Sequence, residues 1–255
     1  MDRLIAIAVG NTRTRLALFE GGELSRGQTV VNEDPAELAT RARDLLQGAQ
    51  GATPVIASVN DPVADRLEEA LDAAGASPVR IGRDLAIPLR HTLDDASTLG
   101  QDRALNALGA YSVAEQACVI VDVGTAVSVD FVDGQGVFHG GVIAPGLNMM
   151  LRALHEQTAA LPSLRYEACD PARGPFGLDT AHAMRLGVCY AVRGLVRFAA
   201  ERFADFYEGY PQIIATGGDM GVLEDDGLIE HFVPDLQLVG IHACVAQGAR
   251  ADDDA

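Results

Sequence analysis

Apolar runs that end at a glycine recur along this chain. Residues 4–9 are wholly apolar, and a turn containing Gly10 separates them from a second apolar run at residues 16–19. Residues 119–123 and 126–132 repeat the arrangement around a Gly-Thr turn. Val and Ile are frequent in these runs, which is typical of buried, pleated backbone. Each pair of runs is therefore predicted to form two strands joined by a tight turn.

The two strand pairs resemble each other in sequence. Aligned on their glycines, Ile7-Ala8-Val9-Gly10 lies over Val121-Asp122-Val123-Gly124, about half the chain length away. Such an echo indicates a duplicated domain in which one glycine-turn hairpin opens each half. We expect two lobes, residues 1–117 and 118–255, with a cleft between them where a ligand would bind.

Strands and helices of moderate length alternate through the rest of the chain. Asp34-Pro35 and Asp61-Pro62 each supply an N-cap followed by proline, which predicts two helix starts. Asp179-Thr180 is predicted to cap the longest helix, which ends at about residue 206. The alternation favours an α/β fold with a parallel component. Further strands are predicted at 54–59, 78–81, 136–145 and 212–216, further helices at 104–111 and 147–154, and a last strand and helix at 236–249.

Composition and charge exclude several classes of function. The 255 residues are 48% hydrophobic, which suffices for one large core or two modest ones. With a formal net charge of −17, we expect no nucleic-acid partner. All 19 basic residues are arginine. Without lysine there is no P-loop lysine, no protein-kinase strand lysine and no Schiff-base catalysis. Any bound phosphate must be held by backbone N–H groups, arginines, hydroxyls or a metal ion.

The cysteines and the chain start bear on the compartment. The four cysteines have no metal-ligand spacing, and Cys118, Cys189 and Cys244 lie in apolar runs typical of a core. The chain enters a predicted strand almost at once, which leaves no room for a signal peptide. No apolar run reaches the length of a transmembrane helix. We therefore expect a cytoplasmic protein with no membrane partner.

Three turns that follow strands could bind phosphate. They are Gly10-Asn11-Thr12, Gly124-Thr125 and Gly217-Gly218-Asp219. Glycine lets the backbone approach a ligand closely, and the neighbouring Asn and Thr side chains can donate hydrogen bonds. Any one turn alone would be ordinary, but the internal duplication favours a phosphate site. Asp122 lies inside an apolar strand, where a charge is costly unless it is paired or holds a cation.

The segment Gly100-Gln101-Asp102-Arg103 places an acid next to a cation at a predicted helix start. On spacing alone, the favoured interpretation is a helix N-cap and its neighbour. The other interpretation is a general base beside an arginine that binds an anion.

Taken together, these motifs resemble the type III pantothenate kinases. This family belongs to the actin-like ATPase and sugar-kinase superfamily, and the resemblance implies an α/β fold of two duplicated ribonuclease-H-like lobes. It also implies ATP-dependent phosphorylation of pantothenate to 4'-phosphopantothenate, the first step of coenzyme A biosynthesis. The resemblance covers essentially the whole chain and is carried by residues 7–12, 100–103, 106–110, 121–126, 140–146, 158–162, 180 and 216–219.

The resemblance also implies roles for single residues. Asp102 matches the family's proton acceptor, and Asp122 matches its ligand for a monovalent cation, K⁺ or NH₄⁺. ATP would be bound with Mg²⁺, and the family's members are homodimers with pantothenate near the subunit interface. The implied substrate-binding residues are Gly100, Gln101, Asp102, Arg103 and Thr180. The implied ATP-binding residues are Ala8, Val9, Gly10, Asn11, Thr12, Arg13, Thr14, Arg15 and Thr125.

The chain departs from the family pattern at Ala8. The family has an aspartate there, at the position equivalent to Asp122 in the internal repeat. This loss favours an alternative, a non-catalytic paralogue that binds nucleotide or pantothenate and has a regulatory or accessory role. A third possibility, another small-molecule kinase or phosphatase of the superfamily, would leave the Gly-x-Asp-Arg segment unexplained. We expect residue 8 to lie near the solvated phosphate site and not in dry core.

Overall fold

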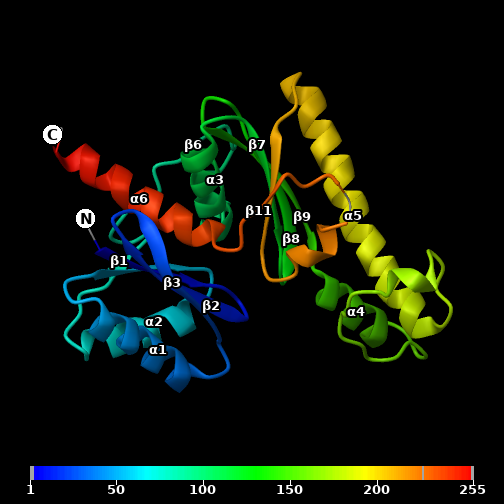
Figure 1. The fold of residues 1–255 in the computed structure, drawn as a ribbon, viewed down its shortest axis with the longest axis horizontal. Helices are drawn as coiled ribbons and strands as arrows, with labels where there is room; N and C mark the ends of the chain where they lie inside the picture. The colour runs from blue at the N-terminus through cyan, green and yellow to red at the C-terminus, as the bar shows by residue number, and fades with distance from the viewer. Residues whose placement is uncertain (1–2, 226, 254–255) are drawn as a thin grey trace. The chain divides into compact units, whose positions relative to one another are not determined.

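The computed structural model describes residues 3–225 and 227–253 (Figure 1). It divides into two compact units. The first comprises Met1–Glu115, Gly136–Phe138 and Asp235–Ala255, and the second comprises Gln116–Gln135 and His139–Pro234. The first change of unit lies near the expected boundary after residue 117. The C-terminal segment differs, because it belongs to the first unit and not to the second lobe.

The first unit is built on a five-stranded sheet with the order β3-β2-β1-β4-β5. β1 pairs with β2 in antiparallel fashion and with β4 in parallel, and β4 pairs in parallel with β5. β3 follows the first hairpin and pairs with β2 in antiparallel fashion. The bounds are β1 Arg3–Val9, β2 Arg13–Glu20, β3 Glu23–Val31, β4 Thr53–Ser58 and β5 Val79–Arg80.

The sheet of the second unit repeats that order when it is read from β9 to β11, so that β9-β8-β7-β10-β11 corresponds to β3-β2-β1-β4-β5. It reads β11-β10-β7-β8-β9, followed by β6, which pairs with Val137 and Phe138 of the first unit. β7 is antiparallel to β8 and parallel to β10, as β1 is to β2 and β4. The predicted α/β class and the internal duplication are therefore confirmed. The bounds are β6 Arg90–His91, β7 Cys118–Val123, β8 Ala126–Val132, β9 Val137–Pro145, β10 Gln212–Thr216 and β11 His231–Phe232.

Helices cover both faces of the first sheet. Ile5, Ile7 and Val9 pack on one face with residues of α1 (Pro35–Gly48) and α2 (Asp61–Asp72). Leu4, Ala6 and Ala8 pack on the other with residues of α3 (Gln101–Ala114) and α6 (Leu236–Asp253). Burial on both faces explains why β1 is apolar from Leu4 to Val9 and does not alternate. It also explains why α6 belongs to this unit, since Leu238 and Ile241 are part of its core.

The second sheet has an apolar face and a partly polar face. Val119, Val121 and Val123 pack with α4 (Leu147–Glu156) and α5 (Thr180–Tyr207) in one core. The alternate positions of the same strands include four polar side chains, Asp122, Ser128, Asp130 and Thr216. Asp122 lies opposite Ser128 on β8 and Thr216 on β10. A polar row therefore crosses the middle of this sheet, whereas the equivalent row of the first sheet consists of Ala57, Ala8 and Arg15.

Two of the three predicted helix caps are confirmed. Asp34 accepts from Glu37 N, and Asp179 accepts from His182 N. The prediction at Asp61 is wrong by one residue, because Asn60 is the N-cap of α2 and makes no side-chain cap bond. Asp61 instead accepts a 2.8 Å bond from Arg80, a buried arginine that three acids of α2 surround.

Of the strand and helix predicted at residues 236–249, the helix is confirmed and the strand is wrong. A continuous helix, α6, occupies Leu236–Asp253, and the last strand, β11, lies earlier at His231–Phe232. A short apolar run such as Leu236 to Val239 fits either structure, and packing against β1 selects the helix. The irregular segments contain three short 3₁₀ helices, η1 at Ala96–Thr98, η2 at Pro171–Arg173 and η3 at Met220–Leu223.

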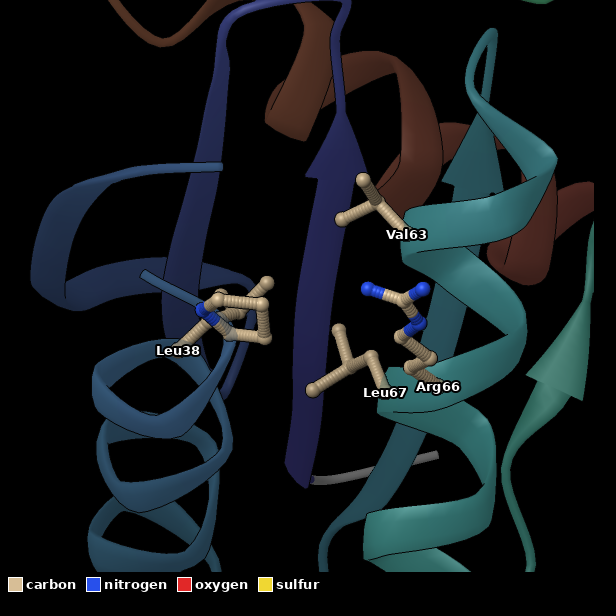
Figure 2. Close-up of a pocket in the computed structure, with 5 residues that line it drawn as sticks. Leu38, Val63, Arg66 and Leu67 are labelled. Carbon is tan, nitrogen blue, oxygen red and sulfur yellow. The ribbon is translucent and has the colours of Figure 1, made fainter. Parts of the chain in front are cut away.

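A shallow depression lies between α1 and α2 (Figure 2). None of the residues predicted to bind ATP, substrate or a cation lines it, and its lining is mainly apolar. It is therefore a gap in helix packing and not the predicted phosphate site. The lining residues are Pro35, Leu38, Val63, Arg66 and Leu67. Within residues 3–225 and 227–253, no helix is long and apolar enough to cross a membrane.

Candidate active site

The turn after β1 is closed by its own backbone and held from outside by Asn32. Gly10 N donates to Arg13 O at 3.0 Å, and a Cβ on Gly10 would lie 2.9 Å from the same oxygen. Asn32 Nδ2 donates to Gly10 O at 2.7 Å, and Asn32 N donates to Thr12 O at 3.0 Å. Thr14 Oγ1 donates to Asn32 Oδ1 at 2.8 Å. The protein alone therefore fixes the shape of this turn.

A second asparagine, Asn60, supports the turn from the end of β4. Its Nδ2 donates to Asn11 O at 3.3 Å, and its backbone N donates to Ser58 Oγ at 2.8 Å. The motifs of the sequence predict a site role for neither Asn32 nor Asn60. The sequence signal that could have identified both is their position, because each asparagine follows the end of a strand that lies in the same sheet as β1.

The predicted ATP segment, residues 8–15, contains exposed and buried residues. Residues 11–13 are exposed at the turn. Val9 and Thr14 are fully buried, and the Thr14 hydroxyl is bonded to Asn32. Within this segment, the backbone and side chains of residues 11–13 are therefore the groups best placed to meet a phosphate.

Ala8 lies in an apolar environment. It is 2% exposed and belongs to the same core cluster as Leu105 of α3. Its partners across the sheet are Arg15 on β2 and Ala57 on β4. Arg15 is itself paired with Asp235, at 2.6 Å. The expectation that residue 8 lies in a solvated site is therefore wrong.

Asp102 lies in the first turn of α3 and is not its cap. Gly100 is the N-cap residue, and the Asp102 carboxylate accepts a 2.8 Å bond from Arg103 N. A Cβ on Gly100 would lie 2.6 Å from Asp102 Oδ1, so the carboxylate folds back over the glycine. The Arg103 guanidinium lies over the Phe138 ring, 5.7 Å from its centroid. The favoured interpretation of Asp102 as an N-cap is wrong, and its carboxylate remains partly exposed.

In the second unit, Asp122 lies against glycine backbone. A Cβ on Gly217, whose φ is +93°, would collide with Asp122 Oδ1 and with Val123 O. Asp219 N donates to the same Val123 oxygen at 2.9 Å. Gly217 therefore brings the turn after β10 directly against the end of β7.

Gly146, which follows β9, closes the turn that contains Thr125. Gly146 N donates to Thr125 O at 3.1 Å, and a Cβ on Gly146 would collide with Gly124 O. Thr125 itself is exposed. The ends of β7, β9 and β10 thus meet at one place, which the resemblance associates with a cation and ATP.

The donor set at this place consists of oxygens. Asp122 Oδ1 and Val123 O both face the position where a Cβ on Gly217 would lie. Carboxylate and carbonyl oxygens are the ligands that hard cations such as K⁺ prefer. The residues present therefore fit a monovalent cation. Among the residues that the structure describes, no three or more His, Cys, Asp or Glu side chains form a metal-binding group.

Thr180 is exposed and is the first residue of α5. The preceding Asp179 accepts from His182 N at 2.8 Å and from the Arg173 guanidinium at 3.0 Å. The His182 N–H, and then Arg173, lower the pKa of the Asp179 carboxyl. Asp179 is therefore a charged cap that fixes the start of α5 beside Thr180.

Three cysteines are core residues, as predicted. Cys118, Cys189 and Cys244 are buried. Burial raises the pKa of the Cys118 thiol to about 12 and that of Cys244 to about 11. At neutral pH these two thiols stay protonated and act as small apolar side chains.

Comparisons with known proteins identify the family. The family model of the type III pantothenate kinases matches residues 4–202, which include the predicted ATP, substrate and cation residues but not the turn at residues 217–219. A type III pantothenate kinase of Dehalococcoides mccartyi (strain 195) is 31% identical over 251 residues, covering 94% of this chain and 96% of that protein. A relative of the same name from Caulobacter vibrioides is 33% identical over 255 residues, covering 93% and 95%. The chain belongs to the type III pantothenate kinase family.

Solved structures agree with the fold. A conserved Baf family protein of Campylobacter jejuni has a TM-score of 0.61 at 18% identity, with 97% of this chain and 100% of that chain covered. The ethanolamine utilization protein EutJ of Carboxydothermus hydrogenoformans has a TM-score of 0.53 at 15% identity, with 95% and 89% covered. At these identities the likeness concerns the fold alone. The family resemblance stated from the motifs is confirmed by the family model and the relatives.

We predict that Gly217→Ala destabilises the protein more than a strained glycine alone would explain. Both Gly217 and Gly75 have positive φ, +93° and +82°, but a Cβ on Gly75 would meet no atom within 4 Å. Gly75→Ala should lower the free energy of unfolding by about 1 kcal/mol, and Gly217→Ala by roughly 2–4 kcal/mol. Urea denaturation of both variants measures the difference, and equal losses would show that the contact with Asp122 is loose.

Ala8→Asp tests the missing acid. Because Ala8 is buried among apolar side chains, the new carboxylate should lower the free energy of unfolding by about 2 kcal/mol even with Arg15 nearby. It also places a carboxylate two residues before Gly10, where the resemblance implies an acid, so Mg²⁺-dependent ATP binding should become tighter. Titration calorimetry with and without Mg²⁺ measures this, with Ala8→Asn as the uncharged control. Unchanged ATP affinity would show that the absent acid does not limit binding.

Proposed function

We propose that this protein transfers the γ-phosphoryl group of ATP to the primary hydroxyl of pantothenate, forming 4'-phosphopantothenate and ADP. The observation that carries the proposal is the placement of Asp102, a partly exposed carboxylate beside Arg103, in the same unit as the glycine turn at Gly10. Membership of the type III pantothenate kinase family supports it, since the relatives bear that name.

Residues of the chain supply positioning and charge in this reaction. The Asp102 carboxylate accepts the proton of the attacking hydroxyl, whose oxygen forms the new bond to the γ-phosphorus while the bond to ADP breaks. The Arg103 guanidinium attracts the negatively charged phosphoryl group, or the carboxylate of pantothenate, to the start of α3. Backbone N–H groups and side chains of residues 11–13, with Thr125, hold the phosphates.

Two cations belong to the proposal. Asp122 and neighbouring carbonyl oxygens would bind K⁺ or NH₄⁺, for which their oxygen donors are suited. Mg²⁺ would be held mainly by the phosphates of ATP, because Ala8 contributes no carboxylate. When bound, these ions neutralise charge that develops on the phosphoryl group.

One observation favours a second function, a non-catalytic protein that binds nucleotide or pantothenate. Ala8 removes an acid that the family has, and the residue is packed into a dry core. Against this, Asp102, Asp122 and Thr125 are all present, and the relatives are named as kinases. The kinase is therefore the better-supported proposal. We also place the protein in the cytoplasm, where a step of coenzyme A biosynthesis takes place.

We further propose that the protein is a homodimer that associates through α5. Tyr190 and Phe198 are 48% and 66% exposed on this helix, and exposed apolar groups of this size mark contact surfaces. Gly187 and Gly194 have open space where a Cβ would lie. A glycine inside a helix lowers helix stability by about 1 kcal/mol relative to alanine. Since neither glycine is needed for packing within its own unit, its presence calls for an explanation outside that unit. Close approach of a second copy supplies that reason.

Asp102→Asn should lower the rate of pantothenate phosphorylation by roughly two to four orders of magnitude, because the amide cannot accept the proton. The melting temperature should barely change, since Asp102 does not cap α3. Mass spectrometry of phosphopantothenate gives the rate, and Asp34→Asn, at the N-cap of α1, is the matched control. An Asp102→Asn rate equal to wild type would remove Asp102 from the chemistry.

Gly194→Arg should convert the dimer to a monomer, because a long charged side chain cannot enter a close helix contact. Ala36→Arg, on the exposed first turn of α1, adds the same charge elsewhere and should leave the dimer intact. Sedimentation velocity at micromolar concentration distinguishes the species. A wild-type monomer, or a dimer that tolerates Gly194→Arg, would contradict the proposed interface.

A further inference from the structure

The side chain of Gln101 joins the start of α3 to the ends of two strands. Its Oε1 accepts from Ser58 N at 3.2 Å, at the last residue of β4. Its Nε2 donates to Ile81 O at 3.1 Å, one residue beyond β5. Gln101 is the first residue of α3, directly before Asp102. Both ends of its amide are thus bonded to backbone, which differs from the substrate contact that the resemblance implies for this residue.

The amide occupies the place of a missing ladder bond. Ile56 pairs in parallel with Arg80, and Ile81 N donates to Ile56 O at 2.9 Å. In a parallel ladder the next bond would join Ser58 N to Ile81 O. These are the two groups that Gln101 bonds, so its amide is inserted between the strands at the point where they separate. Without it, a partly buried N–H and a carbonyl would lose their partners.

Gly82 makes room for this insertion. A Cβ on Gly82 would lie 2.5 Å from Gln101 Nε2, and the residue has a φ of +87°. Any side chain at position 82 would therefore displace the amide. The absence of a side chain at Gly82 therefore leaves the space that the Gln101 amide occupies.

The same strand end also supports the glycine turn. Ser58 Oγ accepts from Asn60 N at 2.8 Å, and Asn60 Nδ2 donates to Asn11 O at 3.3 Å. Ser58 is thus bonded through its N–H to Gln101 and through its hydroxyl to Asn60. A continuous set of bonds runs from the turn at Asn11 to the residue that precedes Asp102.

We propose that Gln101 is a positioning residue, which holds Asp102 in register with the turn at Asn11 through Ser58. The inference rests on the proposed function, because Asp102 is there the proton acceptor and the turn there holds ATP. Phosphoryl transfer depends on placing the acceptor oxygen and the phosphate within a few tenths of an ångström of the reactive geometry. Loss of the amide would loosen that placement without removing a group that touches either substrate.

Gln101→Met tests the inference, because methionine has a similar length and makes neither bond. Its kcat for pantothenate phosphorylation should fall roughly ten- to a hundredfold. The affinity for ATP, measured by calorimetry, should stay within about twofold, because the turn keeps its bonds to Asn32. Ser112→Ala is the matched control, since it removes a side-chain bond to Gly109 O at the far end of the same helix. It should leave kcat unchanged.

Gly82→Ala provides an independent test in which Gln101 itself remains. It should lower kcat as Gln101→Met does, whereas Gly75→Ala, with a similar φ and open space, should not. A wild-type kcat in Gln101→Met, or an equal loss in Ser112→Ala, would overturn the inference. So would a rise of both KM values at constant kcat, which would show a binding role. If the wild type fails to phosphorylate pantothenate, the proposed function fails and this inference with it.

Discussion

The tight glycine turn that ends the first strand of each unit is the constraint on which the structure depends. In the first unit Gly10 N bonds to Arg13 O, and in the second Gly124 N bonds to Ala126 O. Each turn joins the central strand of its sheet to an antiparallel neighbour, β1 to β2 in the first unit and β7 to β8 in the second. The remaining strands follow in the same order in both sheets, and the helices pack on the faces that this order creates.

Different groups support the two turns, and different polar groups are found beside each turn. The side chains of Asn32 and Asn60, which follow β3 and β4, hold the first turn, and the strand before it is apolar up to Ala8 and Val9. Glycine backbone holds the second, where Gly146 and Gly217 press against the residues that follow Asp122. One duplicated scaffold therefore presents exposed polar residues in one unit and, in the other, the carboxylate and carbonyl oxygens of Asp122 and Val123 close to a glycine.

The sequence predicted the features that depend on neighbouring residues. The glycine hairpins, the caps at Asp34 and Asp179 and the long α5 are local patterns, and all appear. Features that depend on distant contacts could not be read in this way. Asn60 and Gln101 acquire their roles when β4, β5 and α3 meet. Asp102 is not the cap because the N-cap is Gly100, two residues earlier. The short apolar run at residues 236–239 was ambiguous until its packing with β1 decided for a helix.

The central claim is that this chain phosphorylates pantothenate despite Ala8. The most direct measurement is the release of ADP from ATP by the wild-type protein, with K⁺ and Mg²⁺ supplied, in the presence and absence of pantothenate. We predict that ADP forms when pantothenate is present, in an amount equal to the phosphopantothenate produced. ATP that binds but is not consumed when pantothenate is added would contradict kinase activity and support a non-catalytic protein.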